Sequence, residues 1–335
     1  MIEFDLTKKD VYHQRHDYSY YDEASVALVH SEKKLTEIFE NNKNSSVIKT
    51  RALCIEYMLK HARLPFSSDE LFVGGIEYDN FLGKKRYEML MDLAKSDDPS
   101  MFILHGDSGE SGAYTGDCDF GHNHPNYETL FKKGIGGIIS EAKEKLSICE
   151  SEKKDFYESV ITVYEAIKNY ILRFASMCEK YKDDSDTASL RYTTLVNISR
   201  KPPKNLFEAL QLQMIIYHLI QTLTENTTRS LGIWDKLLYP YYEKDIKHGT
   251  FSDDDVKNIF RHCMIYYRAI GFSANIPFML CGVDDNGNDA SNELTRLILD
   301  TYISLDIKDP KIQVRYHEDI PNDILETIVK SIAKG

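Results

Sequence analysis

The sequence predicts a predominantly helical protein of the α/β class. Residues 152–182 place six apolar side chains at three- and four-residue spacings, which is the pattern of one long amphipathic helix. Residues 276–283 and 312–316 are short, apolar-rich runs typical of strands, and a helical pattern over residues 291–304 separates them. Because a strand–helix–strand order is typical of a parallel sheet, we expect a parallel strand pair within a mostly helical chain.

Length and composition limit the classes of function. The chain has 335 residues, of which 42% are hydrophobic, enough for one large or two ordinary domains. Its 53 acidic and 41 basic residues give a net charge of −12, which disfavours nucleic acid as a partner. We expect no membrane partner and a cytoplasmic location, since no apolar run approaches the ~20 residues of a membrane span and the first ten residues do not form a secretion signal. Six irregularly spaced cysteines indicate reduced thiols.

The first half of the chain reads as helices with two interruptions. One is the apolar run over residues 71–76, and the other is a loop over residues 97–125 that is crowded with Gly, Asp and Ser. Structureless connections longer than about 12–15 residues are uncommon in compact domains, so we expect this loop to have a function.

The second half alternates helices and strands. A helix is expected over residues 206–223, and another begins near Asp253, where Ser252 supplies an N-cap and acidic residues fill the first turn. The chain contains no internal repeat or flexible linker. We place any internal boundary near residues 185–205, between the helical part and the strand–helix part.

Two clusters of potential metal ligands are present. Cys118, His122 and His124 could in principle bind zinc, but their spacing fits no common zinc signature, so we expect no metal site and favour a loop of capping and substrate-facing polar groups. Residues 284–289 resemble a calcium loop, but the glycine is misplaced and a strand precedes it. We expect a turn into a helix, with Asp289 or Ser291 as its cap.

Other familiar catalytic patterns are missing or weak. The sequence contains no Walker loop, no dinucleotide GxGxxG after a strand, no GxSxG elbow and no HExxH. Cys54 and Glu56 could place a thiol beside a carboxylate base. Because the surrounding residues read as an amphipathic helix, we favour Cys54 as a small core residue.

Six segments carry a more specific pattern: residues 69–74, 121–138, 202–211, 230–242, 282–294 and 309–315. The second segment reads GHNHPNYETLFKKGIGGI. It is similar to GH-x-x-P-D-Y-x-x-x-L-x-x-G-L-x-G-I of the glycyl radical enzyme family, the pyruvate formate-lyase-like group that includes glycerol and hydroxyproline dehydratases, choline lyase and arylacetate decarboxylases. Six matches in the family's order make the resemblance specific. Two departures are Ile233, where the family usually has Arg, and Lys236, where it often has Gln.

The resemblance implies a ten-stranded α/β barrel built from two half-barrels. Residues 1–335 would be the N-terminal portion of the pyruvate formate-lyase-like domain, a helical layer followed by part of the barrel, with few strands. The family's chemistry needs a glycyl radical and a cysteine that receives it as a thiyl. Neither the Gly-Cys-Val-Glu-like loop nor the Arg-Val-x-Gly-Tyr-like loop occurs here. We therefore expect no catalytic residue and no bound cofactor in this truncated chain.

The resemblance also implies partners and site residues. The partners are a small-molecule substrate, a radical-SAM activating enzyme and a second copy of the chain in a homodimer. His122 matches a family position near substrate in some dehydratases, and Thr227 and Thr228 match a pair that shapes the pocket. Asn275 completes the expected substrate-binding set. The alternatives are a loop-bracing role for His122 and ordinary turn chemistry for the two threonines. The threonine pair suggests a substrate other than glycerol or pyruvate.

Two functions follow from these expectations. The first is the N-terminal part of a glycyl radical lyase or dehydratase of anaerobic metabolism, acting on a small polar metabolite and inactive by itself. The alternative is a free-standing, catalytically dead relative that binds a ligand or a partner.

Overall fold

The computed structural model describes most of the chain: residues 24–26, 28–67, 70–76, 124–224, 230–270, 276–307 and 309–333. Of the predicted loop over residues 97–125, only His124 and Pro125 lie within these ranges. No helix in the described part is both long and apolar enough to cross a membrane.

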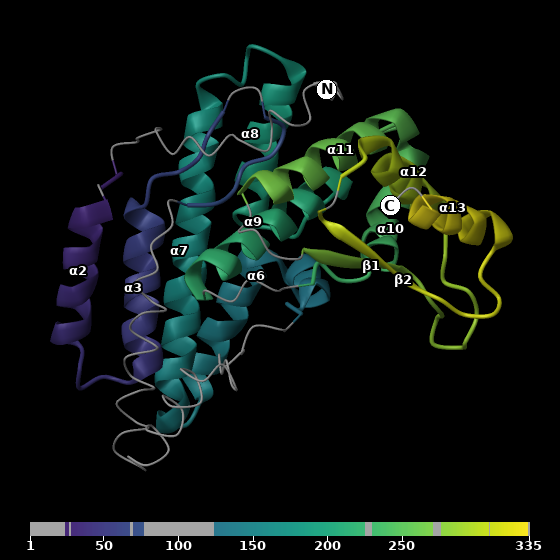
Figure 1. Ribbon diagram of the computed structural model, residues 1–335. Helices are drawn as coiled ribbons and strands as arrows, with labels where there is room; N and C mark the ends of the chain where they lie inside the picture. Colours follow the sequence, from purple (N-terminus) through teal and green to yellow (C-terminus); the bar gives the residue numbers. More distant parts are fainter. Residues whose placement is uncertain are drawn as a thin grey trace, which may run out of the picture.

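The first half of the described chain forms a layer of helices that lie side by side (Figure 1). The layer contains α2 (Leu28–Asn41), α3 (Val47–His61), α6 (Tyr127–Ile148), the short η2 (Ser151–Lys153), α7 (Lys154–Glu179) and α8 (Asp186–Ile198). The long helix predicted over residues 152–182 is confirmed as α7. Ile167, Ile171 and Phe174 of its apolar stripe are buried, whereas Phe156 at the start of the helix is exposed. The helix packs against α3, α6 and α8.

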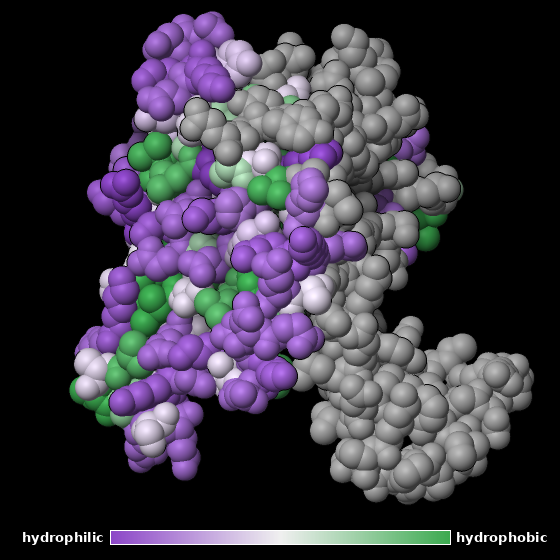
Figure 2. Space-filling view, turned by 90° about the vertical axis from the view of Figure 1, so that its left-hand side faces the viewer, coloured by the Kyte–Doolittle hydropathy of each residue, from purple (hydrophilic) through white to green (hydrophobic). Residues whose placement is uncertain are grey.

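The outer face of this layer is mostly hydrophilic, with scattered apolar side chains (Figure 2). Val47 and Ile48 on α3 are exposed. Single apolar residues on a polar surface are common in folded proteins.

The second half alternates helices with two strands. Its elements are α9 (Leu206–Thr224), α10 (Trp234–His248), α11 (Asp253–Ile270), β1 (Pro277–Cys281), α12 (Glu293–Leu305), β2 (Lys311–Arg315) and α13 (Asn322–Ala333). β1 and β2 are parallel neighbours, as predicted. An isolated parallel bridge from Ile233 to Met279 adds a third short segment on the other side of β1.

The sheet buries one face against the helices. Phe278 and Leu280 of β1 are buried, and they pair in register with Ile312 and Val314 of β2, which pack against the same core. The alternate residues of β2 are exposed. Because side chains alternate across a strand, the other face of the two-stranded sheet carries the exposed residues.

The apolar run 71–76 joins the helical layer to the second half. It is buried but forms neither helix nor strand. The side chain of Gln211 on α9 accepts from the amide of Val73 at 3.1 Å and donates to its carbonyl at 2.7 Å. The hydroxyl of Tyr170 on α7 donates to the carbonyl of Gly75 at 2.8 Å. Buried side chains thus supply hydrogen bonds to backbone groups that have no helix or strand partner in this segment.

Most local predictions are confirmed, and one is wrong. Cys54 is fully buried, as its core assignment requires. Ser252 caps α11, accepting from the amide of Asp255 at 3.2 Å. The N-cap of α12, however, is Asn292 instead of Asp289 or Ser291, because Asn292 and Thr295 form a reciprocal capping box. Asp289 instead accepts hydrogen bonds from the amide and hydroxyl of Ser291.

Candidate functional site

The four residues that the sequence predicts at a substrate site lie outside the described part of the chain. They are His122, Thr227, Thr228 and Asn275, and Cys118 of the zinc alternative also lies outside it. These assignments stay predictions. Among the residues that the structure describes, no group of three His, Cys, Asp or Glu side chains could hold a metal ion.

Described residues close to these positions along the chain lie together in space. Nδ1 of His124 is 3.4 Å from the carbonyl oxygen of Ser230, which follows the threonine pair by two residues. The amide of Leu231 donates to the carbonyl of Pro277, at the start of β1, at 2.8 Å. The segment before α6, residues 230–233 and the start of β1 therefore meet in one region.

Gly232 makes this meeting sterically feasible. Its φ is 88°, and a Cβ at this position would lie 2.8 Å from Cε1 of His124. The amide of Gly232 donates to the hydroxyl of Ser230 at 3.0 Å, and the buried Gln213 donates to the carbonyl of Leu231 at 2.8 Å. Glycine is needed here for two reasons: its positive φ is strained for other residues, and any Cβ would clash with the imidazole of His124.

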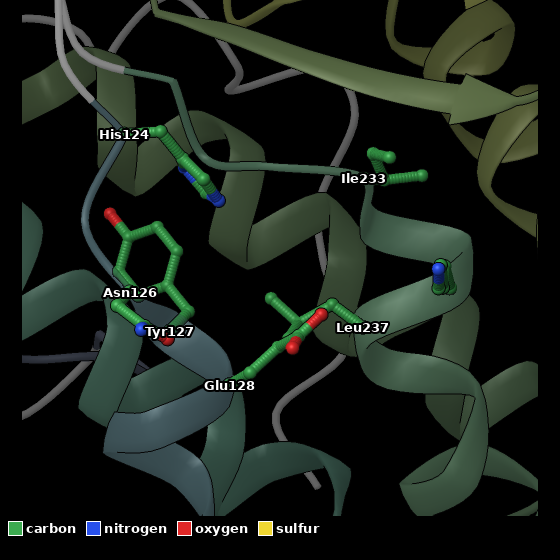
Figure 3. Close-up of a pocket in the computed structure, with 7 residues that line it drawn as sticks. His124, Asn126, Tyr127, Glu128, Ile233 and Leu237 are labelled. Carbon is green, nitrogen blue, oxygen red and sulfur yellow. The ribbon is translucent and has the colours of Figure 1, made fainter.

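A cavity of about 380 Å³ opens between the beginnings of α6 and α10 (Figure 3). Its lining residues are His124, Asn126, Tyr127, Glu128, Ile233, Lys236 and Leu237. The first four form one wall, and the last three come from the start of α10. The volume lies within the range of roughly 300–1,000 Å³ that is typical of small-molecule sites.

The wall at α6 is held in place by its own contacts. Asn126 caps α6, and its side-chain oxygen accepts from the amide of Thr129 at 2.9 Å. The rings of His124 and Tyr127 meet edge to face, with centroids 5.4 Å apart, and Tyr127 is buried. The cavity is therefore largely preformed on this side.

Asp235, in the first turn of α10, ties this helix to the sheet. Its buried carboxylate accepts from the amide of Cys281 and from the hydroxyl of Thr295, both at 2.7 Å. Asn292 donates to the backbone carbonyl of Asp235 at 3.1 Å. Burial raises the pKa of the Asp235 carboxyl above its ordinary value, although the hydrogen bonds that it accepts lower the pKa.

This pKa shift predicts a pH dependence of stability. An acid whose pKa is higher in the folded state than its ordinary 3.8 stabilises the fold when protonated, and this contribution is lost as pH rises through the folded-state pKa. Relative to the parent, Asp235→Asn should therefore gain in free energy of unfolding as pH rises above about 4. Urea denaturation of both proteins between pH 4 and 8 measures this difference. A difference that does not change with pH would contradict the shift.

The carboxyl ends of β1 and β2 carry a second polar cluster. Nε2 of His317, just after β2, lies 3.0 Å from a carboxylate oxygen of Asp289. Cys281 ends β1 with a φ of 63°, and burial raises the pKa of its thiol to about 12. The thiol is therefore protonated at neutral pH and is unsuited to act as a thiolate nucleophile.

The sequence did not predict the role of Asp235 or the pair of His317 with Asp289. The bonded partners are 60 and 28 positions apart, and no pattern of neighbouring residues indicates that they meet.

The chain matches the family described as pyruvate formate lyase-like over residues 106–335. Among curated proteins, it is 28% identical over 242 residues to a (2S)-3-sulfopropanediol dehydratase of Klebsiella oxytoca, covering 64% of this chain and 29% of that protein. It is 28% identical over 232 residues to a 4-hydroxyphenylacetate decarboxylase glycyl radical subunit of Clostridioides difficile, covering 60% and 25%. The chain thus spans only about a quarter to a third of the length of these relatives.

Solved structures share the fold. A structure from Roseburia inulinivorans, concerned with 1,2-propanediol dehydration, superimposes with a TM-score of 0.82 at 18% identity, over 99% of this chain and 50% of that one. A glycyl radical enzyme from Archaeoglobus fulgidus gives a TM-score of 0.78 at 20% identity, over 98% and 50%. The predicted fold class is therefore confirmed, and this chain corresponds to about half of those structures.

Proposed function

Because the chain belongs to the pyruvate formate lyase-like family, we propose that it is the N-terminal part of a glycyl radical lyase or dehydratase that acts on a small polar metabolite. The observation that carries the proposal is the match over residues 106–335, together with a parallel strand pair in which the carboxyl end of β1 is bonded to α10. The names of the curated relatives, a dehydratase and a decarboxylase glycyl radical subunit, support the reaction class.

In this proposal the chain supplies scaffold and binding surface. A glycyl radical elsewhere in the complete enzyme would provide hydrogen-atom abstraction. The described residues fit a supporting role: Asp235 holds the start of α10 on the end of β1, and Gly232 lets His124 approach the same region. The thiol of Cys281 is fully buried instead of facing open space. We therefore propose that the isolated 335-residue chain is inactive, and that the complete enzyme acts in the cytoplasm as a homodimer with a radical-SAM activating enzyme.

Electron paramagnetic resonance of the isolated chain is the first test. After treatment with a radical-SAM activating enzyme, we expect no glycyl radical doublet from this chain, because it carries neither family radical loop. A full-length glycyl radical enzyme treated in parallel shows whether the activation is competent. A doublet assigned to a residue of this chain would refute its inactivity.

Mass spectrometry of the native protein from its source is the second test. A product much longer than 335 residues that carries both loops supports the enzyme. A native end at Gly335 supports the alternative, a free-standing relative that binds a ligand or a partner. The cavity between α6 and α10 is the observation that favours this alternative, because the chain forms it from its own residues.

A further inference from the structure

Three positions at which this chain departs from the family pattern line the cavity between α6 and α10. Ile233 stands at a usual Arg and Lys236 at a frequent Gln, and both line the cavity. Asn126, a third lining residue, stands at the Asp of the pattern quoted for residues 121–138. Two opposite charges of the pattern, one on each wall, are thus replaced by an amide and an aliphatic side chain.

The lining of the cavity also carries two opposite charges. Glu128 from α6 and Lys236 from α10 both line it. Among the described residues, neither side chain forms an ion pair within 4.0 Å, although exposed lysines and glutamates elsewhere in the chain do, such as Lys34 with Glu37. A carboxylate from α6 and an ammonium group from α10, neither with an ion-pair partner among the described residues, therefore belong to the lining of one cavity.

The other lining groups provide apolar surface and additional donors. Ile233 and Leu237 contribute aliphatic surface to the lining, and Tyr127 contributes an aromatic ring. The amide nitrogen of Asn126 has no hydrogen-bond partner among the described residues, because the cap of α6 uses the side-chain oxygen. In Figure 3 the imidazole of His124 points into the space between the two helices. Apolar lining with a small number of polar groups that can fix the orientation of a ligand is typical of small-molecule sites.

We propose that this cavity binds a small zwitterion, a molecule with a carboxylate or similar anion at one end and an ammonium group at the other. Lys236 would bind the anionic end, assisted by the amide of Asn126, and Glu128 would bind the ammonium end. A ligand of either single charge would leave one of the two protein charges without a partner. Selectivity for the zwitterion then arises from satisfying both charges at once.

The test is direct binding to the intact chain, without radical activation. The probes are glycine, β-alanine and 4-aminobutanoate, which vary the separation of the charges, with butanoate and butylamine as singly charged analogues. Calorimetry measures affinity, and the methyl resonances of Ile233 and Leu237 report whether binding occurs in the cavity. At least one zwitterion is expected to bind about tenfold more tightly than either analogue, as expected for one further charge-assisted hydrogen bond.

Charge-neutral variants identify the residues responsible. Lys236→Gln and Glu128→Gln should each weaken binding of the preferred zwitterion about tenfold or more. The matched controls are Lys247→Gln on α10 and Glu144→Gln on α6, which lie outside the cavity lining and should leave binding unchanged. Equal affinity for zwitterions and single charges, or no binding of any zwitterion, would overturn the proposal, as would equal affinity of the two cavity variants and the parent. None of these outcomes depends on radical chemistry, so the site and the proposed function are tested separately.

Discussion

Replacing Trp234 by alanine is expected to lower the free energy of unfolding by about 3–5 kcal/mol, the usual cost of removing a large aromatic side chain from a core. Trp234 is fully buried at the start of α10. Its ring stacks on Phe278 of β1 with centroids 4.2 Å apart, and its Nε1 donates to Gln213 at 3.0 Å. The variant would therefore lose packing between helix and sheet, and it would leave a buried amide oxygen without its donor.

Trp234→Phe separates these two contributions. Phenylalanine keeps aromatic packing against β1 but cannot donate to Gln213, so a smaller loss of about 1–3 kcal/mol is expected. Because Trp234 is the only tryptophan of the chain, the measurement is urea denaturation followed by far-ultraviolet circular dichroism instead of fluorescence. A loss below about 1 kcal/mol for the alanine variant would mean that α10 and β1 are not packed as described.

The 335-residue chain by itself is expected to self-associate or to be only marginally stable. Among the described residues, β2 pairs with β1 and has no strand on its other side. On α13, the helix that follows β2 in the chain, Val329 is 56% exposed and Ile332 is 73% exposed. Unpaired strand edges and exposed apolar side chains both favour association, against the repulsion from a net charge of −12.

Sedimentation equilibrium across a concentration series measures this association. Val329→Lys with Ile332→Lys should raise the dissociation constant at least tenfold, since burying one aliphatic side chain is worth about 1.5–3 kcal/mol. Ile148→Lys is the matched control, because Ile148 is 81% exposed at the end of α6 in the helical layer, and it should have no effect. A chain that stays monomeric and melts cooperatively at high temperature would instead favour the free-standing binding module.

Contiguous residues were enough to predict most of the elements. The stripe of α7, the serine cap of α11 and the parallel pair β1–β2 were all predicted, because helix periodicity, caps and strand runs are properties of neighbouring residues. The wrong cap of α12 shows the limit of such local reasoning. Asp289, Ser291 and Asn292 are all good cap residues, and the choice of Asn292 coincides with its contact to Asp235.

The sequence by itself determined the fold class, the order of the elements and, through six ordered segments, the family of this protein. Only the tertiary structure decided which distant residues meet. Gln211 bonds to Val73 across 138 positions, and Asp235 bonds to Thr295 across 60. The cavity likewise brings Glu128 and Lys236 into one lining. Such contacts depend on how whole helices pack around one core, and no spacing along the chain encodes that packing.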